Sequence, residues 1–260
     1  MKITRALRIA TREGRAIVGS PAGTLIVGTF WLVAGLLLIT LLWRFRDGLF
    51  QVARSTLQTE PQGLHINDWV IRPLLYNVGT VLIFFVPLLT MRSFAEERRS
   101  GNLELLMSQP IRGAELLLGK SFGVGLSLLA CLSVFLIHGV VLALVSTPDW
   151  PATAVGFLGL TLLGLLFVSV GVFLSVLSRS QVEAAVLSLG GLLLLVVGPN
   201  SVTTGPRWVQ ETAAFFSVLG RFEDFTRGIL DFGHVAFFLG VSFILLAMAL
   251  RGLDLVRWQG

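Results

Sequence analysis

The sequence predicts an all-α integral membrane protein with six transmembrane helices. Of its 260 residues, 54% are hydrophobic and only 13% are charged, whereas a soluble domain has about a quarter of its residues charged. Six apolar windows recur along the chain, and most approach or exceed the ~20 residues that a helix needs to cross the hydrocarbon core. The windows are continuously apolar rather than alternating in polarity, which excludes a membrane β-barrel. They cover residues 23–43, 73–91, 119–146, 154–177, 184–198 and 232–250.

Residues 1–20 are predicted to form an amphipathic interfacial helix on the surface of the inner leaflet. Four arginines fall within an arc of about 80° on a helical wheel, opposite a set of apolar residues. Anionic headgroups attract each such arginine by ~1 kcal/mol; an unstructured basic flank is the alternative. Ser20 and Pro21 are expected to break the helix before the first span. The four arginines are Arg5, Arg8, Arg12 and Arg15.

The distribution of basic residues predicts which side of the membrane each segment faces. Six spans bring both termini to the same side. The segments on that side hold 13 Lys and Arg residues, and the segments on the other side hold 7. The positive-inside rule therefore places both termini in the cytoplasm. In a membrane protein this basic balance, a net charge of +5, does not predict a nucleic-acid partner.

The most informative segment, 92–120, joins the second and third spans on the side of the termini. Residues 94–99 can continue the second span as a helix, and Ser100 and Gly101 form a stop of the kind that supplies a left-handed cap. A short helix is then expected over residues 102–107, and Pro110 ends it. The sequence thus predicts an ordered, charge-rich elbow between these two spans.

This elbow is expected to contact a partner. Leu103, Leu106 and Met107 share one face of the short helix, with Glu104 on another, and an apolar patch of this kind is unfavourable in water without a docking surface. Two alternatives remain open. The elbow can lie back on the bilayer, or the run of Glu and Arg over residues 96–99 can be an ordinary solvated flank of the second span.

Glycines in the fourth window, at positions 156, 159, 164 and 171, predict either close helix packing or a dimer seam.

The fifth window is short, which leaves three alternatives. Its helix tilts little, it continues beyond Pro199, or it re-enters the membrane. In the segment 199–231, Pro206 can begin a helix that Gly220 caps, and residues 221–230 can form a second one. A plain amphipathic connector on the outer membrane surface is the alternative.

No catalytic, cofactor-binding or metal-binding residues are expected in this chain. It has neither a His-Glu-x-x-His pair nor a Gly-x-Ser-x-Gly elbow. The tripeptide at residues 119–121, Gly-Lys-Ser, has the wrong distance to the preceding Gly113 for a phosphate-binding loop, and an apolar span follows it. Cys131, the single cysteine, excludes a disulfide within the chain. His138 lies deep within a span, where bonding to a neighbouring helix is a commoner role than transport.

Three motifs resemble those of one known family. Residues 90–106 read TMRSFAEERRSGNLELL, followed by Pro110 and by Gly-Lys at 119–120; residues 222–228 read FEDFTRG; and Ser-Pro occurs at 20–21. Together with six spans, they resemble the permease subunits of ABC-2 type transporters, and most closely the gliding-motility-type branch. The resemblance covers nearly the whole chain. Asn102 stands where the family usually has threonine, a departure that leaves the charged and glycine positions unchanged.

The resemblance implies a role for each of these segments. It makes the chain the membrane subunit of an exporter in the bacterial inner membrane, and it makes the elbow a coupling helix in a groove of a separate ATPase. Two ATPase copies would hold ATP and Mg²⁺, and a second permease protomer, identical or related, would complete the export path. The implied coupling residues are Phe94, Glu96, Glu97, Arg98, Gly101, Leu103, Glu104, Leu106, Met107 and Pro110.

The same resemblance implies that the segment 199–231 forms short helices that dip into the outer leaflet and help to close the exit. The residues concerned are Phe222, Glu223, Asp224, Phe225 and Arg227. A non-transporting membrane scaffold or sensor of an envelope complex, driven by an ATPase, is the competing hypothesis. An intramembrane enzyme is disfavoured because the chain lacks a nucleophile set and a metal set.

Overall fold

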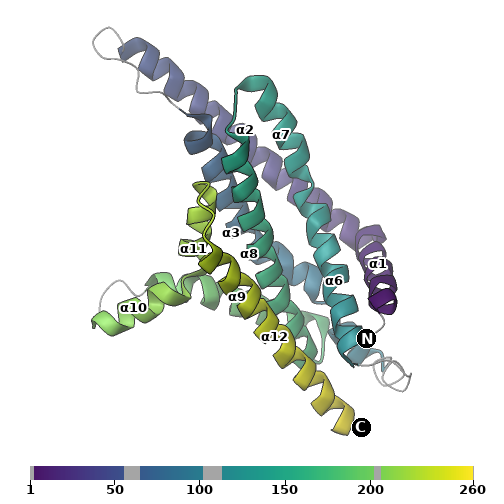
Figure 1. The fold of residues 1–260 in the computed structure, drawn as a ribbon. Helices are drawn as coiled ribbons and strands as arrows, with labels where there is room; N and C mark the ends of the chain where they lie inside the picture. Colours follow the sequence, from purple (N-terminus) through teal and green to yellow (C-terminus); the bar gives the residue numbers. More distant parts are fainter. Residues whose placement is uncertain (1–2, 56–64, 102–112, 202–205, 260) are drawn as a thin grey trace.

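A computed structural model describes the chain except for residues 1–2, 56–64, 102–112, 202–205 and 260. All regular elements in the described ranges are helices (Figure 1). In chain order they are α1 (Ile3–Gly19), α2 (Pro21–Ser55), the π-helix η1 (Asn67–Ile71), α3 (Arg72–Thr90), α4 (Ala95–Arg99), α6 (Gly113–Leu132), α7 (Val134–Val145), α8 (Trp150–Leu177), α9 (Gln181–Ser201), α10 (Arg207–Phe216), α11 (Val218–Thr226) and α12 (Phe232–Gln259).

Six helical stretches of the described chain are long and apolar enough to cross a membrane, which confirms the predicted number of spans. They are Pro21–Gln51, Asn67–Arg99, Gly113–Val145, Trp150–Leu177, Gln181–Pro199 and Phe232–Asp254. The first span belongs to a 35-residue helix that continues well past the end of its apolar window at Trp43. The break between α1 and α2 lies at Ser20, as predicted.

The bundle has two ends that differ in content. Both chain termini lie at one of them, together with α1, α4 and the last turns of α12 (Figure 1); we call it the terminal end. The opposite end holds η1, α11 and the connection between α7 and α8. At this opposite end Asn67 exchanges two hydrogen bonds with the backbone of Asp149, at 3.2 and 2.9 Å. Because both termini lie at the terminal end, the chain crosses the bundle an even number of times, as six spans require.

Helix α8 is the central helix of the bundle, and α3, α6, α9, α11 and α12 all pack against it. A Cβ atom at Gly159 would overlap the side chain of Phe225 in α11, and one at Gly171 would overlap Thr90 in α3. Gly156 meets Leu75 and Gly164 meets Leu128 in the same close way. These glycines allow close packing within one chain, which is the first of the two predicted uses.

Two spans depart from the uninterrupted helices that the sequence predicts. The second span does not run smoothly into residues 94–99: α3 ends at Thr90 and the chain turns before α4 begins. The turn is stabilised from a distant helix, because the backbone N–H groups of Phe94 and Ala95 both donate to Ser175 Oγ of α8, at 3.2 and 3.3 Å. The third span is interrupted at Ser133, whose hydroxyl donates to the carbonyl of Ala130 at 2.7 Å.

The segment after the fifth window also differs in its helix boundaries. Of the three alternatives, continuation is the one observed, because α9 passes Pro199 and ends at Ser201. Two short helices follow, but Gly220 lies inside the second instead of capping the first. The boundary is Ser217, whose side chain accepts a hydrogen bond from the Gly220 N–H at 3.2 Å. The second helix therefore spans Val218–Thr226 rather than residues 221–230, and Gly228 follows it with a φ of 80°.

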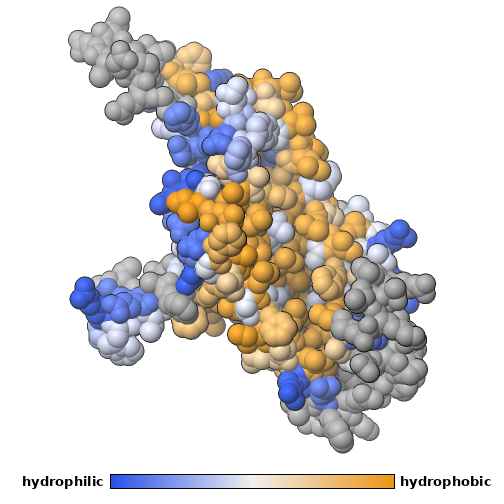
Figure 2. Space-filling view, in the orientation of Figure 1, coloured by the Kyte–Doolittle hydropathy of each residue, from blue (hydrophilic) through white to orange (hydrophobic). Residues whose placement is uncertain are grey.

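The outer surface of the bundle is apolar, as lipid-facing helices require. Figure 2 shows a continuous hydrophobic area over the bundle, whereas hydrophilic residues gather towards its ends and on α10. In the spans of α2, α9 and α12 only 22%, 22% and 17% of the residues are buried within the chain. Leu32, Leu194 and Phe243, for example, are more than half exposed. These three spans therefore offer most of their surface to lipid or to another protein.

Candidate functional site

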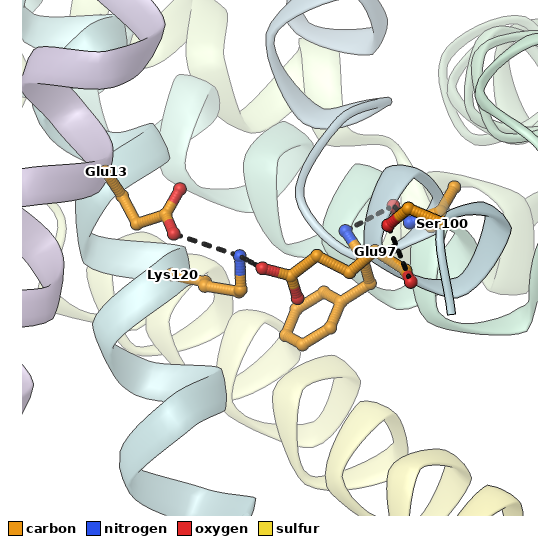
Figure 3. A network of polar contacts seen from close by, with 7 residues as sticks. Glu13, Glu97, Ser100 and Lys120 are labelled. Carbon is orange, nitrogen blue, oxygen red and sulfur yellow. Dashed lines mark hydrogen bonds and ion pairs between the residues drawn. The ribbon is translucent and has the colours of Figure 1, made fainter. Parts of the chain in front are cut away.

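A buried lysine organises the terminal end. Lys120 lies in the second turn of α6, and its side chain is only 4% exposed. Its Nζ contacts Glu13 Oε1 of α1 at 3.0 Å and Glu97 Oε1 of α4 at 2.7 Å (Figure 3). The same Nζ lies 5.5 Å from the centre of the Phe94 ring. We call Glu13, Phe94, Glu97 and Lys120 the Lys120 cluster; it joins three helices that are far apart in the sequence.

The local packing of α1 on α6 explains how Glu13 reaches Lys120. Gly123 lies one turn beyond Lys120, and a Cβ atom there would come within 2.6 Å of the Glu13 Cβ. Gly14 faces the same contact, where a Cβ would lie 3.3 Å from the Gly123 carbonyl oxygen. Two glycines thus bring the backbones together. A charge removed from water in this way is tolerated because two carboxylates and an aromatic face surround it.

Helix α4 is fixed at both of its ends. Ser175 holds its N-terminus, as described above, and Arg98 Nη1 lies 3.5 Å from the Val176 carbonyl oxygen of α8. At its C-terminus Gly101 has a φ of 71°, which confirms the predicted left-handed stop. Helix α4, which precedes residues 102–112 of the elbow, is therefore anchored to both α6 and α8.

Apart from Gly101, the structure separates the predicted coupling residues into three groups. Phe94 and Glu97 point into the Lys120 cluster, and Phe94 is 1% exposed. Glu96 is exposed on α4, whereas Arg98 is half-buried against α8. Five positions lie outside the described residues: Leu103, Glu104, Leu106, Met107 and Pro110.

The predicted N-terminal helix is present as α1. One side of it packs against α6, and arginines are exposed on another side. Along α1, Ala10 and Gly14 are buried, whereas Arg12 and Arg15 are exposed. Arg5 and Arg8 belong to the same helix, but their side chains lie outside the described part of the structure.

Sequence reasoning missed Glu13 and Lys120 as a pair. A signal was present: a lysine within an apolar window needs a partner, and Glu13 is the only acid among the first 20 residues.

At the opposite end, the five predicted gate residues meet around α11. Phe222 and Phe225 are fully buried, the first against Gly79 and the second against Gly159. Glu223 Oε1 accepts hydrogen bonds of 2.8 Å from Arg227 and from Arg72 of η1–α3. These bonds, that of Arg227 first, hold the pKa of the Glu223 carboxyl below its usual value. Asp224 Oδ2 lies 3.6 Å from His234 Nδ1 at the start of α12.

The remaining titratable residues within the spans do not form a reactive set. His138 is buried beside the Phe135 ring at 5.3 Å, and its Nδ1 has no hydrogen-bond partner among the described residues. Cys131 is buried as a free thiol. Within the described part of the chain, no three His, Cys, Asp or Glu residues gather as a metal site would require.

Comparison with known proteins agrees with this architecture. A family model described as "ABC-2 family transporter protein" matches residues 39–250, which is most of the chain. The match includes α4, the Lys120 and Glu97 members of the cluster, and all of α11. No curated protein matches the chain.

Proposed function

Since the chain belongs to the ABC-2 transporter family, we propose that it is the permease subunit of an ATP-binding cassette exporter. In this role the chain spans the membrane, and a separate ATPase, which binds ATP and Mg²⁺, supplies the energy for substrate movement. Family membership supports a permease with an ATPase partner. The observation that carries the coupling step is the anchoring of α4 to both α6 and α8.

The terminal end is the cytoplasmic end in this proposal. It holds the basic segments that the positive-inside rule assigns to the cytoplasm, and α4 leads from it into the segment with the predicted coupling helix. Glu96 and Arg99 are exposed there and form, with residues 103–110, the surface offered to the ATPase.

Movement of the ATPase reaches the membrane through contacts already made within the chain. A displacement of α4 pulls on α6 through the 2.7 Å contact of Glu97 with Lys120. It pulls on α8 through the hydrogen bonds to Ser175. Packed helices that move as bodies are the usual way in which such a local displacement becomes a change of shape.

The export path needs two permease protomers. One chain packs α8 at its own centre, while α2, α9 and α12 bury little of their surface. A second protomer, identical or related, and two ATPase copies complete the assembly. At the opposite end α10 and α11 help to close the exit, with Phe222 and Phe225 as the packed part of the closure and Glu223 as its ionic link to α3.

The test reverses charge on the proposed ATPase surface without disturbing the Lys120 cluster. The double variant Glu96→Lys with Glu104→Lys should insert normally, but it should lose the ATPase on co-purification. Buried interface charge pairs are worth about 2–5 kcal/mol when one partner is lost. Glu97 is unsuitable for this test because its charge is already paired inside the chain.

Asp68→Lys is the matched control, because Asp68 is an exposed acid at the opposite end. If the double variant retained the ATPase and its transport-linked hydrolysis at the level of this control, the coupling proposal would be refuted. ATP hydrolysis that responds to the chain while no substrate moves would favour the scaffold or sensor hypothesis.

A further inference from the structure

Both ring nitrogens of His234 face carboxylates at the opposite end of the bundle, where α11 meets α12 (Figure 1). His234 lies in the first turn of α12, and its side chain is 17% exposed. Its Nδ1 lies 3.6 Å from Asp224 Oδ2 of α11, and its Nε2 lies 3.9 Å from Asp231 Oδ2, just before α12. The centre of the buried Phe225 ring lies 6.2 Å from the imidazole. The imidazole is therefore placed between two acids that belong to different elements.

This arrangement suits the charged form of His234 better than the neutral form. A neutral imidazole has one N–H, so one of its nitrogens presents a lone pair to a carboxylate, whereas an imidazolium has an N–H at each nitrogen. Nδ1 is buried and has no hydrogen-bond partner among the described residues. Both distances are within the 4 Å of an ion pair. Protonation therefore replaces a repulsive contact by an attraction to each acid.

The other groups near the start of α12 oppose a cation less strongly than these two acids favour it. The N-terminus of a helix carries about half a positive charge, and Arg221 of α11 lies 4.3 Å from the centre of the Phe237 ring, one turn beyond His234. Helix α8 packs against both α11 and α12, and it has no titratable side chain over residues 150–177. Helix α6 also contacts α12, but its charged residues, Glu115 and Lys120, lie at the terminal end.

Histidine side chains change their charge between about pH 5 and 8. We propose that His234 is a pH-sensitive link that fastens α12 to α11. As the pH falls through this range, the imidazolium pairs with Asp224 and Asp231, and the link forms. As the pH rises, the proton leaves and the link is lost. In the proposed orientation this end faces away from the cytoplasm, so the link responds to acidity outside the inner membrane.

A second link of α11 does not change in the same pH range. Glu223 Oε1 pairs with Arg227 and with Arg72 of α3, both at 2.8 Å. The two arginines, Arg227 first, hold the pKa of the Glu223 carboxyl below its usual value, so this carboxyl stays ionised down to pH 5. Acid should therefore strengthen the contact of α11 with α12 while its contact with α3 persists. The further consequence, a more firmly closed exit, rests on the proposed function; the link itself does not.

Hydrogen exchange of the purified full-length protein, followed by mass spectrometry, tests the link. The peptide over residues 217–235 covers α11, the turn and the start of α12; in this turn the Ile229 N–H donates to the Asp224 carbonyl at 3.0 Å. Intrinsic exchange rates depend on pH, so the wild type is compared with His234→Gln at each pH. At pH 5.5 the wild type should exchange about two- to fivefold more slowly, which is the size of effect expected from a partly exposed ion pair. At pH 8 the two should exchange equally.

His65→Gln is the matched control, because His65 is an exposed histidine at the same end. It should follow the wild type in the peptide at both pH values. Asp224→Asn should instead follow His234→Gln, since it removes the α11 side of the link. Asp231 is less suitable, because its Oδ1 also accepts the Gly233 N–H at 2.7 Å.

Equal exchange of the wild type and His234→Gln at pH 5.5 would overturn the inference, and so would a difference of the same size at pH 8. If His234→Gln fails to fold, as judged by circular dichroism, then wild-type exchange of Asp224→Asn at pH 5.5 is sufficient to reject the link. Neither measurement requires an ATPase or a substrate. Failure of the exporter proposal would therefore leave the result on the link unchanged.

Discussion

At the scale of single residues, Lys120 joins α6 to both α1 and α4. Its ammonium is shared by two carboxylates from separate helices, which leaves each carboxylate dependent on one side chain. Replacing one member of such a group leaves the others charged and partly buried, whereas replacing all members leaves nothing to compensate. The cost of a variant should therefore depend on how many members are changed.

Lys120→Met should destabilise the protein strongly. Losing one partner of a buried pair costs about 3–5 kcal/mol, and the value here should lie at the lower end because Glu13 and Glu97 are still 29% and 20% exposed. The triple variant with Glu13→Gln and Glu97→Gln should recover most of this loss. Thermal melts in detergent measure both. A triple variant less stable than Lys120→Met would show that the pairing does not determine the stability.

Residue-scale interactions were also the hardest to predict from the sequence. Gly101 was predicted correctly, because a left-handed stop is a local property of a Ser-Gly pair at a helix end. The links of Lys120 to Glu13 and of Ser175 to the start of α4 were not predicted. Each joins positions about 80 or more residues apart, and no periodicity in the sequence records which side chains meet across helices.

At the scale of elements, small residues determine how closely the helices approach. Gly159 and Gly171 of α8 face Phe225 and Thr90, respectively, with no space for a side chain. Gly240 of α12, also a glycine within an apolar span, has no atom within 4 Å of its Cβ position. The two kinds of glycine look alike in the sequence, and they differ only in what packs against them.

Gly159→Val should therefore displace α11 from α8 and destabilise the bundle. Overpacking typically costs about 1–3 kcal/mol, and the overlap here is with an aromatic ring that is itself fully buried. Gly240→Val should change stability by less than about 1 kcal/mol, which is the size of the helix-propensity difference alone. The comparison uses melting temperatures of the two variants. Equal melting temperatures would contradict the packing role assigned to α8.

Element boundaries show the same division between local and distant causes. The six spans and the break at Ser20 follow from runs of apolar residues and from a proline, so they were predicted correctly. The turn between α3 and α4 was missed, because it depends on hydrogen bonds from α8. The start of α11 was missed because Ser217, rather than Gly220, marks its boundary.

At the scale of the whole molecule, the arrangement of the ends predicts a simple topology experiment. Single cysteines in place of Arg15 and Asp254 lie on exposed positions of the terminal end, and one in place of Asp68 lies on the opposite end. In a Cys131→Ser background, an impermeant thiol reagent applied to intact cells should label only the cysteine at position 68. Labelling at position 15 or 254 would reverse the proposed orientation.

The central position of α8 has a consequence for uncontrolled passage of solutes across the membrane. Ser175, which holds α4, and Gly159, which receives Phe225, are 16 positions apart on this helix, or about 24 Å at 1.5 Å per residue. Its only proline, Pro151, lies in its first turn, so the stretch between these contacts lacks the commonest cause of a kink. A helix that moves as a rigid body cannot move at one of these points without moving at the other. The two sides of the membrane would then be mechanically interlocked, and a conformation open to both at once would require α8 to bend.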